Sequence, residues 1–155
     1  MATPQQLYRE LDRMASEGLI AARLVEQDRR PNKRLYSLTE QGRHALLEFT
    51  EVPPKPGAIR EDLLVQVQAV DSGNIEAVRD ALTDRRNWAT AKLARYRRMQ
   101  EHLLAGRTEA AYLAESERFG PYLTLLRGIG FEEENIDWAA RALAVIEQRP
   151  GAAAR

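Results

Sequence analysis

Residues 3–46 read TPQQLYRELDRMASEGLIAARLVEQDRRPNKRLYSLTEQGRHAL, and this stretch decides the fold. A helical pattern runs up to Gly18, and two short apolar runs follow at 19–26 and 34–38, which we expect to form strands. The DRRPNK segment between them is rich in turn-forming residues, and a second helical pattern starts at Thr39. The order helix, strand, basic turn, strand, helix predicts the second half of a winged helix-turn-helix.

The first helix carries signals for both of its ends. Thr3 and Gln6 have the spacing of a capping box, in which each side chain accepts a hydrogen bond from the other residue's backbone amide. Pro4 suits the first helical position, and Gly18 suits a left-handed residue just past the last turn. The apolar stripe of this helix consists of Leu7, Leu11 and Met14.

The polar side of this helix is a candidate DNA-reading face. In a helix-turn-helix, the first residues of the reading helix contact base edges and phosphates in the major groove. Glutamine pairs with adenine, and arginine pairs with guanine or with phosphate. The residues that we expect to face the major groove are Thr3, Gln5, Gln6, Tyr8 and Arg9. An ordinary solvated helix face is the alternative, and only the neighbouring wing argues against it.

The turn between the two strands concentrates positive charge. Arg29, Arg30, Lys33 and Arg34 place four cations within six positions. Cations on a hairpin tip suit phosphate or minor-groove contact, because they release the counterions condensed on DNA. A charged tip that keeps edge strands from aggregating is the alternative. The wing residues that we expect to contact DNA are Arg29, Arg30, Asn32, Lys33, Arg34 and Tyr36.

These motifs resemble the PadR family of bacterial transcriptional regulators. The matching elements are the Thr-Pro-x-Gln-Leu-Tyr-Arg-Glu-Leu helix, the Glu-Gly-Leu-Ile exit and the Arg-Pro-Asn-Lys-Arg-x-Tyr-Ser-Leu-Thr-Glu-x-Gly wing. Residues 122–143, YLTLLRGIGFEEENIDWAARAL, resemble the C-terminal helical region of one PadR subgroup. The resemblance implies a homodimeric winged-helix repressor, often relieved by a small phenolic or other aromatic effector, with no metal and no catalysis.

The start of the sequence departs from that family pattern. Members begin with two helices that pack on the reading helix, whereas the printed sequence starts at Met1, just before the Thr3 cap. Either a start codon assigned too far downstream or a true truncation would explain this departure. The intact pattern from Thr3 onward favours the first explanation. Without those helices we expect an exposed apolar patch that includes Leu7, Leu11, Met14, Ile20 and Leu46. The competing functional hypothesis is a dimerising or small-ligand-binding helical protein without competent DNA binding.

The pattern beyond the wing predicts a helical second domain. The VPPKPG segment at 52–57 breaks any helix, because proline lacks a donor and disfavours helical geometry before it. We expect a partial winged helix-turn-helix at 1–51, a proline-rich linker at 52–58, a helical dimerisation domain at 59–149 and a disordered tail at 150–155. The predicted fold class is mostly α with a small β-wing, in which the partial winged helix-turn-helix precedes an antiparallel helical dimerisation domain.

Glycine, proline and apolar spacing divide the rest of the chain into helices. The helix from Thr39 should reach Thr50 with Leu46 and Leu47 facing inward. We then expect a short helix at 59–69, one of about thirty residues from Ile75, a segment at 109–128 interrupted at Gly120-Pro121 and closed by Gly128 and Gly130, and a last helix at 132–147. The long helix needs a partner helix, for which a second subunit is one source. Glu132, Glu133 and Glu134 should then lie in the first turn of the last helix, where the helix dipole favours negative charge.

Composition limits the class of protein. The 155 residues include 23 basic and 23 acidic side chains, so a DNA-binding function requires cations gathered on one face. With no cysteine and two separated histidines, we expect no metal, no cofactor and no enzyme activity. No apolar run is long enough to span a bilayer and no secretory leader is recognisable, so we expect a cytoplasmic protein with no membrane partner.

The aromatic residues of the helical domain are the candidates for an effector site. We select Trp88 and Tyr96, because small aromatic ligands often bind between helices. Aromatic residues at helical spacing are more often core or interface residues, and that remains the alternative. The expected partners are therefore double-stranded DNA, a second copy of the chain and a small aromatic effector.

Overall fold

The computed structural model describes residues 3–26, 33–55, 57 and 61–149. The chain divides into two units, Met1–Ala58 and Ile59–Arg155. Helices dominate both units, and the predicted fold class of a mostly α chain with a two-stranded β-wing is confirmed.

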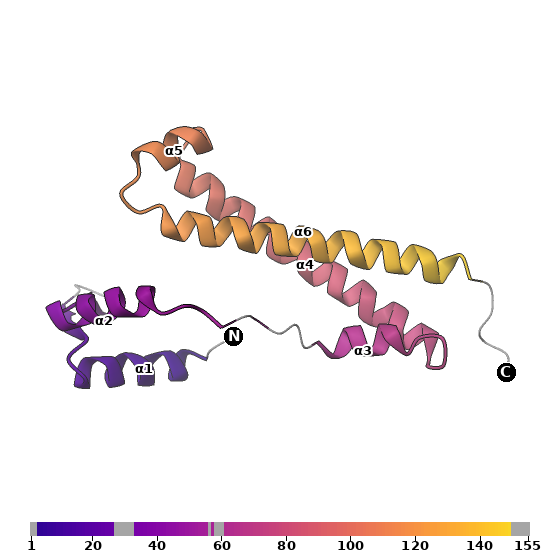
Figure 1. Ribbon diagram of the computed structural model, residues 1–155, viewed down its shortest axis with the longest axis horizontal. Coiled ribbons are helices and arrows are strands. Elements are labelled where there is room, and N and C mark those ends of the chain that lie inside the picture. Colours follow the sequence, from indigo (N-terminus) through magenta and orange to yellow (C-terminus); the bar gives the residue numbers. More distant parts are fainter. Residues whose placement is uncertain (1–2, 27–32, 56, 58–60, 150–155) are drawn as a thin grey trace. The chain divides into compact units, whose positions relative to one another are not determined.

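The first unit contains two helices and a two-stranded sheet. Helix α1 (Pro4–Ser16) precedes strands β1 (Ile20–Val25) and β2 (Lys33–Leu38), and helix α2 (Glu40–Glu51) follows them (Figure 1). The strands pair antiparallel, with Ile20 opposite Leu38 and Val25 opposite Lys33. This arrangement confirms the predicted order of helix, strand, strand, helix.

Both ends of α1 form as their residue types predict. Thr3 Oγ1 accepts a hydrogen bond from the Gln6 amide at 3.2 Å, and Gln6 Oε1 accepts one from the Thr3 amide at 2.8 Å. Gly18 has a φ of 74°, the left-handed conformation that glycine adopts without a steric penalty. The predicted capping box and glycine stop are therefore confirmed.

A tight junction joins the end of α1, the start of β1 and the start of α2. Thr39 Oγ1 donates a hydrogen bond to the Gly18 carbonyl oxygen at 2.6 Å and accepts one from the Gly42 amide at 3.0 Å. The Thr39 amide donates to the Leu19 carbonyl oxygen at 3.1 Å. A Cβ atom added at Gly42 would lie 1.9 Å from that Leu19 oxygen, so a larger residue requires the backbone to move. We name these four residues the Thr39 junction.

Some apolar side chains of the first unit stay exposed. Leu7 is 54% exposed and Leu46 is 52% exposed, in agreement with the expected apolar patch. Ile20 is buried and Leu11 and Met14 are half-buried, so these three do not belong to it. The prediction that Leu46 and Leu47 face inward is wrong within the described chain, because α2 packs on β2 and its outer face stays uncovered.

The second unit is built around two long antiparallel helices. It contains α3 (Asp62–Gln68), α4 (Ile75–Leu104), α5 (Glu109–Glu115) and α6 (Gly120–Glu147). Figure 1 shows α4 and α6 crossing, with α3 beside the start of α4. The expected length of α4 is confirmed, and α6 of the same chain packs against it. Within the described ranges, no helix is both long and apolar enough to cross a membrane.

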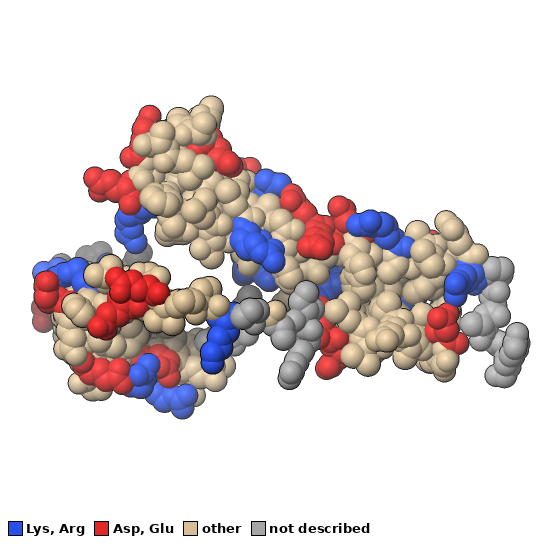
Figure 2. Space-filling model, in the orientation of Figure 1, with Lys and Arg blue, Asp and Glu red and all other residues tan. Residues whose placement is uncertain are grey.

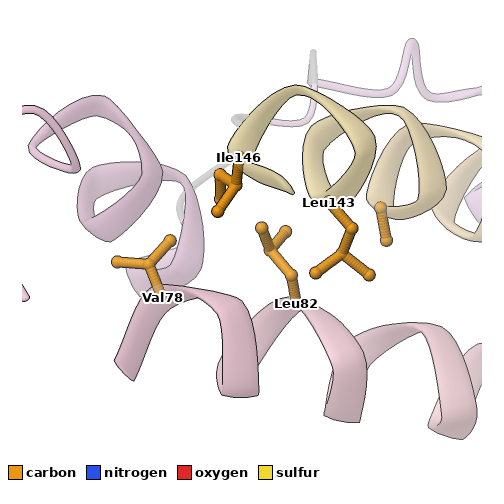
Figure 3. Close-up of a cluster of buried hydrophobic side chains, with 5 residues drawn as sticks. Val78, Leu82, Leu143 and Ile146 are labelled. Atoms are coloured by element: carbon orange, nitrogen blue, oxygen red, sulfur yellow. The ribbon is translucent and has the colours of Figure 1, made fainter. Parts of the chain in front are cut away.

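A hydrophobic cluster holds one end of α4 against the opposite end of α6. Figure 3 shows Val78 and Leu82 of α4 meeting Leu143 and Ile146 of α6, with Ala139 completing the buried set. Leu63, from α3, packs against this cluster. Burying a leucine, isoleucine or valine side chain stabilises the fold by about 1.5–3 kcal/mol, so this end of the unit is firmly packed.

Helix α6 continues through both glycines that were predicted to close a helix, so that prediction is wrong. A Cβ atom at Gly128 would lie 3.0 Å from the Tyr96 ring, whereas one at Gly130 would meet nothing within 4 Å. Gly128 gives Tyr96 room where α4 and α6 approach each other. Packing against α4 therefore outweighs the weak helix propensity of glycine. The short helix expected at 59–69 also has narrower bounds, Asp62–Gln68, within the residues that the structure describes.

The glutamates at 132–134 lie in the middle of α6, so placing them in the first turn of a helix is wrong as well. Glu132 is only 2% exposed. Lys92 Nζ of α4 lies 2.5 Å from Glu132 Oε1, and Asn135 Nδ2 lies 3.4 Å from Glu132 Oε2. The hydrogen bond with Glu132 raises the pKa of the Lys92 ammonium. The negative charge at Glu132 is thus balanced by a lysine of another helix and not by a helix dipole.

Candidate functional site

The first turns of α1 carry all five helix residues that were predicted to contact DNA. Thr3, Gln5, Gln6, Tyr8 and Arg9 are exposed. Gln5, Gln6 and Arg9 line a shallow depression of about 350 Å³. The capping box uses the oxygens of Thr3 and Gln6 as acceptors, which leaves the Thr3 hydroxyl hydrogen and Gln6 Nε2 as donors. This face therefore offers donors to acceptors such as phosphate oxygens and purine base edges.

Arg13, farther along α1, has a different environment from Arg9. Its Nε lies 3.0 Å from Glu10 Oε2, and its Nη1 lies 2.6 Å from Glu17 Oε1. These hydrogen bonds, first with Glu10 and then with Glu17, raise the pKa of Arg13. Two carboxylates offset its charge, so the positive potential of α1 is concentrated at Arg9 and at the helix N-terminus.

The start of β2 carries the described part of the predicted basic cluster. Lys33 and Arg34 begin β2, and both are exposed. Arg34 Nη1 lies 3.5 Å from Asp12 Oδ1, an exposed pair that links the wing loosely to α1. The remaining predicted wing contacts lie outside the described residues: Arg29, Arg30 and Asn32.

Tyr36 lies differently from the other predicted DNA contacts. It stands opposite Ala22 in the sheet, and its side chain is half-buried. Its hydroxyl oxygen is buried and has no hydrogen-bond partner in the part of the chain that the structure describes. A DNA contact through Tyr36 therefore stays a prediction that this geometry does not support.

Acidic and basic side chains are mixed over the visible face of both units. Figure 2 shows Lys and Arg interspersed with Asp and Glu there. Arg97 of α4 pairs with Glu133, and His44 Nδ1 lies 3.5 Å from Glu48 Oε1 on the exposed surface. Among the described residues, no group of three or more His, Asp or Glu is placed to hold a metal ion. Among the described residues that were predicted to contact DNA, Arg9, Lys33 and Arg34 carry the positive charge.

A groove along α3 and α4 contains one of the two predicted effector residues. Its volume is about 720 Å³, and Trp88 in its wall is 62% exposed. The side chains lining it are Leu63, Gln66, Ala81, Asp84, Arg85, Asn87, Trp88 and Ala91. Arg85 forms an ion pair with Glu61, the N-cap residue of α3. Sequence reasoning missed Arg85, because its partner Glu61 precedes a different helix and lies far away along the chain.

Tyr96, the second predicted effector residue, is not one of the described residues that line this groove. It lies where α4 approaches α6, against Gly128. Lys92 Nζ lies 5.7 Å from the centre of the Trp88 ring and 5.6 Å from that of Tyr96. The two aromatic residues thus flank Lys92 along α4 without sharing the groove.

Both units match known protein families. The profile described as the transcriptional regulator PadR-like family matches residues 2–48, and the profile described as virulence activator alpha C-term matches residues 59–147. Together they cover nearly the whole chain in the order that the fold shows. The chain belongs to the PadR-like family of transcriptional regulators.

Relatives of known sequence and structure agree with this assignment. The negative transcriptional regulator PadR of Bacillus subtilis is 25% identical over 148 residues, which are 95% of this chain and 80% of the relative. Its crystal structure with operator DNA has a TM-score of 0.68 at 27% identity, covering 94% of this chain and 80% of that one. Its structure with p-coumaric acid has a TM-score of 0.67 at 26% identity, covering 95% and 80%. The Vibrio cholerae virulence activator AphA has a TM-score of 0.68 at 25% identity, covering 94% and 79%.

Proposed function

We propose that this chain is a homodimeric transcriptional repressor that binds operator DNA through α1 and the wing. The observation that carries the proposal is the exposed, donor-rich start of α1, a helix whose far end the Thr39 junction joins to the strands of the wing. Gln5 and Arg9 would read base edges in the major groove, while Lys33 and Arg34 would bind phosphates. The operator complex of the B. subtilis relative supports DNA as the partner.

The proposed homodimer is supported by apolar side chains exposed on α4 and α6. They range from Phe131, 42% exposed, to Trp88, 62% exposed, and also include Met99, Leu123 and Val145. Exposed apolar surface is typical of subunit interfaces. A twofold dimer would present two reading helices to half-sites about one helical turn apart.

The proposed direction of regulation is repression. The proposed location is the cytoplasm, where bacterial DNA is transcribed. The B. subtilis relative is a negative regulator, and it covers nearly all of this chain. A reporter gene under the upstream region of this protein's own gene tests the direction. Expression should fall when the protein is supplied, and a rise would instead indicate an activator.

Fluorescence anisotropy with a duplex from that upstream region tests the DNA interface. Replacing Arg29, Arg30, Lys33 and Arg34 together by alanine should weaken binding and reduce the slope of log K against log salt concentration by about 2–4. Gln5→Ala and Arg9→Ala should each lower the preference for this duplex over a scrambled one by about 1–3 kcal/mol. The control is a double variant of two exposed cations of α6, Arg127→Gln with Arg141→Gln. This variant should bind the duplex as the parent does.

A helical protein that dimerises or binds a small ligand, without competent DNA binding, is the second candidate. The exposed Leu7, Leu46 and Phe49 of the first unit favour it, because an uncovered apolar face leaves α1 loosely held. Sedimentation and anisotropy on the same sample separate the two candidates. A dimer that binds specific and scrambled duplexes equally would support the second candidate and overturn the wing assignment.

A further inference from the structure

We propose that Glu10 and Glu17 form an autoinhibitory contact with Arg13, which keeps this arginine of the reading helix from binding DNA phosphates. The inference rests on the proposed function, because it concerns the same face of α1. It goes beyond that function by assigning a role to three charged residues that are not among the predicted DNA contacts. We name these three residues the Arg13 clamp.

The position of Arg13 on α1 fits a DNA contact. Gln5, Arg9 and Arg13 are spaced four residues apart, so they lie one above another along one side of the helix. All three are exposed, and their side of α1 lies opposite its apolar stripe. An arginine at this place could bind a phosphate if its guanidinium were available.

The guanidinium of Arg13 is already engaged by two carboxylates. Its Nε lies 3.0 Å from Glu10 Oε2, and its Nη1 lies 2.6 Å from Glu17 Oε1. The two glutamates lie three residues before and four residues after Arg13, so the helix itself keeps both within reach. Arg9, by contrast, forms no ion pair with another residue of the described ranges, and it lines the depression at the start of α1.

The two ion pairs of Arg13 are together comparable in strength to one phosphate contact. An exposed pair at this spacing is worth about a factor of two in an equilibrium constant, so the two are worth about fourfold. One phosphate contact adds about 0.9 to the salt slope, which amounts to about fivefold in affinity between about 1 M and 0.15 M salt. Arg13 would therefore gain almost nothing by leaving its glutamates for DNA.

The ion pair between Arg34 and Asp12 in the same unit provides an internal comparison. It is a single contact of 3.5 Å, and the two side chains are 60% and 66% exposed. One loose pair stabilises an arginine less than a phosphate contact does. We therefore expect Arg34 to leave Asp12 when DNA binds, whereas Arg13 stays with its two glutamates.

A double-mutant cycle, measured by fluorescence anisotropy on the full chain, tests the clamp. The duplexes are the one from the upstream region of the gene and its scrambled version. Arg13→Ala alone should change the affinity for either duplex less than about twofold. Glu10→Gln combined with Glu17→Gln should raise both affinities about fivefold at about 0.15 M salt and steepen the salt slope by about 1. Adding Arg13→Ala to that pair should remove most of the gain, because the freed arginine produces it.

Glu48→Gln combined with Glu51→Gln is the matched control. It removes the same charge from the exposed surface of α2 without touching Arg13, so its gain in affinity should stay below about twofold. Glu10→Gln and Glu17→Gln as single variants each keep one ion pair in α1 and should give intermediate gains. They keep the test decisive if circular dichroism shows that the double variant has lost helix content.

Three results would overturn the clamp. An equal effect of Arg13→Ala in the parent and in the Glu10, Glu17 variant would show that these charges act independently. An equal gain in the α2 control would show that net charge alone raises the affinity. A large loss on Arg13→Ala in the parent would show that Arg13 already contacts DNA. Binding without the expected coupling overturns the clamp alone, whereas no binding of either duplex by any variant overturns the proposed function and the clamp together.

Discussion

Replacing Gly42 by alanine should destabilise the first unit and leave the second unit intact. The new Cβ would lie 1.9 Å from the Leu19 carbonyl oxygen, so α2 and β1 would have to separate by about 1 Å. Forcing extra atoms into a packed site costs about 1–3 kcal/mol. The same movement weakens the two hydrogen bonds of the Thr39 hydroxyl, each worth about 0.5–1.5 kcal/mol. Alanine recovers about 1 kcal/mol of helix propensity, so the net loss is about 1–5 kcal/mol.

Hydrogen exchange followed by mass spectrometry measures this loss in each unit separately. Amides of α1, β1, β2 and α2 should exchange about tenfold faster or more in Gly42→Ala, while those of α4 and α6 keep their parent rates. Gly57→Ala is the matched control in the same unit, because a Cβ there meets nothing within 4 Å. Parent-like exchange in α1 and α2 of Gly42→Ala would refute the argument that the close approach to Leu19 requires glycine.

Three further predictions concern the second unit. Gly130→Ala should raise the free energy of unfolding by about 0.5–1 kcal/mol because its site is open, whereas Gly128→Ala should lower the melting temperature; equal shifts would contradict the packing described. In denaturant titrations Lys92→Met should cost about 3–5 kcal/mol, because it leaves the carboxylate of Glu132 buried and unpaired. Adding Glu132→Leu should recover most of that loss, and no recovery would mean that the pair is not coupled. Burial raises the pKa of Tyr122, so above its usual value of 10.0 the folded chain binds more protons than the unfolded chain and stability falls as pH rises. Thermal melts of Tyr122→Phe should show a shallower fall above about pH 10, and an unchanged fall would assign the effect to other groups.

The features of the first unit that the sequence predicts depend on neighbours along the chain. Thr3 and Gln6 cap α1 through contacts three residues apart, and Gly18 ends it through its own backbone conformation. The role of Gly42 depends instead on Leu19, which precedes it by a whole hairpin. Its position in the Glu-x-Gly motif is visible in the sequence, but the reason for a glycine there is visible only in the fold.

The errors in the second unit have the same physical origin. Local propensity alone predicts that Gly128 ends a helix. The reason for a glycine there is the Tyr96 ring, which belongs to another helix and is not visible in the local sequence. Three successive glutamates look like a helix start until Lys92 is found beside Glu132. Trp88 could be selected from the sequence as an aromatic residue of the helical domain, whereas its neighbour Arg85 acquires meaning only when α3 lies against α4.

The pair of Lys92 and Glu132 also bears on how the two long helices find their alignment. Small and branched apolar side chains recur along both, and such side chains alone would tolerate a slip of one helical turn. A slip of that size would move the nearly buried carboxylate of Glu132 away from its lysine, at a cost of several kcal/mol. We therefore expect the pair to add little net stability to the native hairpin but to exclude misregistered ones. The Lys92–Glu132 pair in the middle of the two helices therefore determines which residues of α4 and α6 lie side by side. It thereby also determines which surface the second unit offers to a partner.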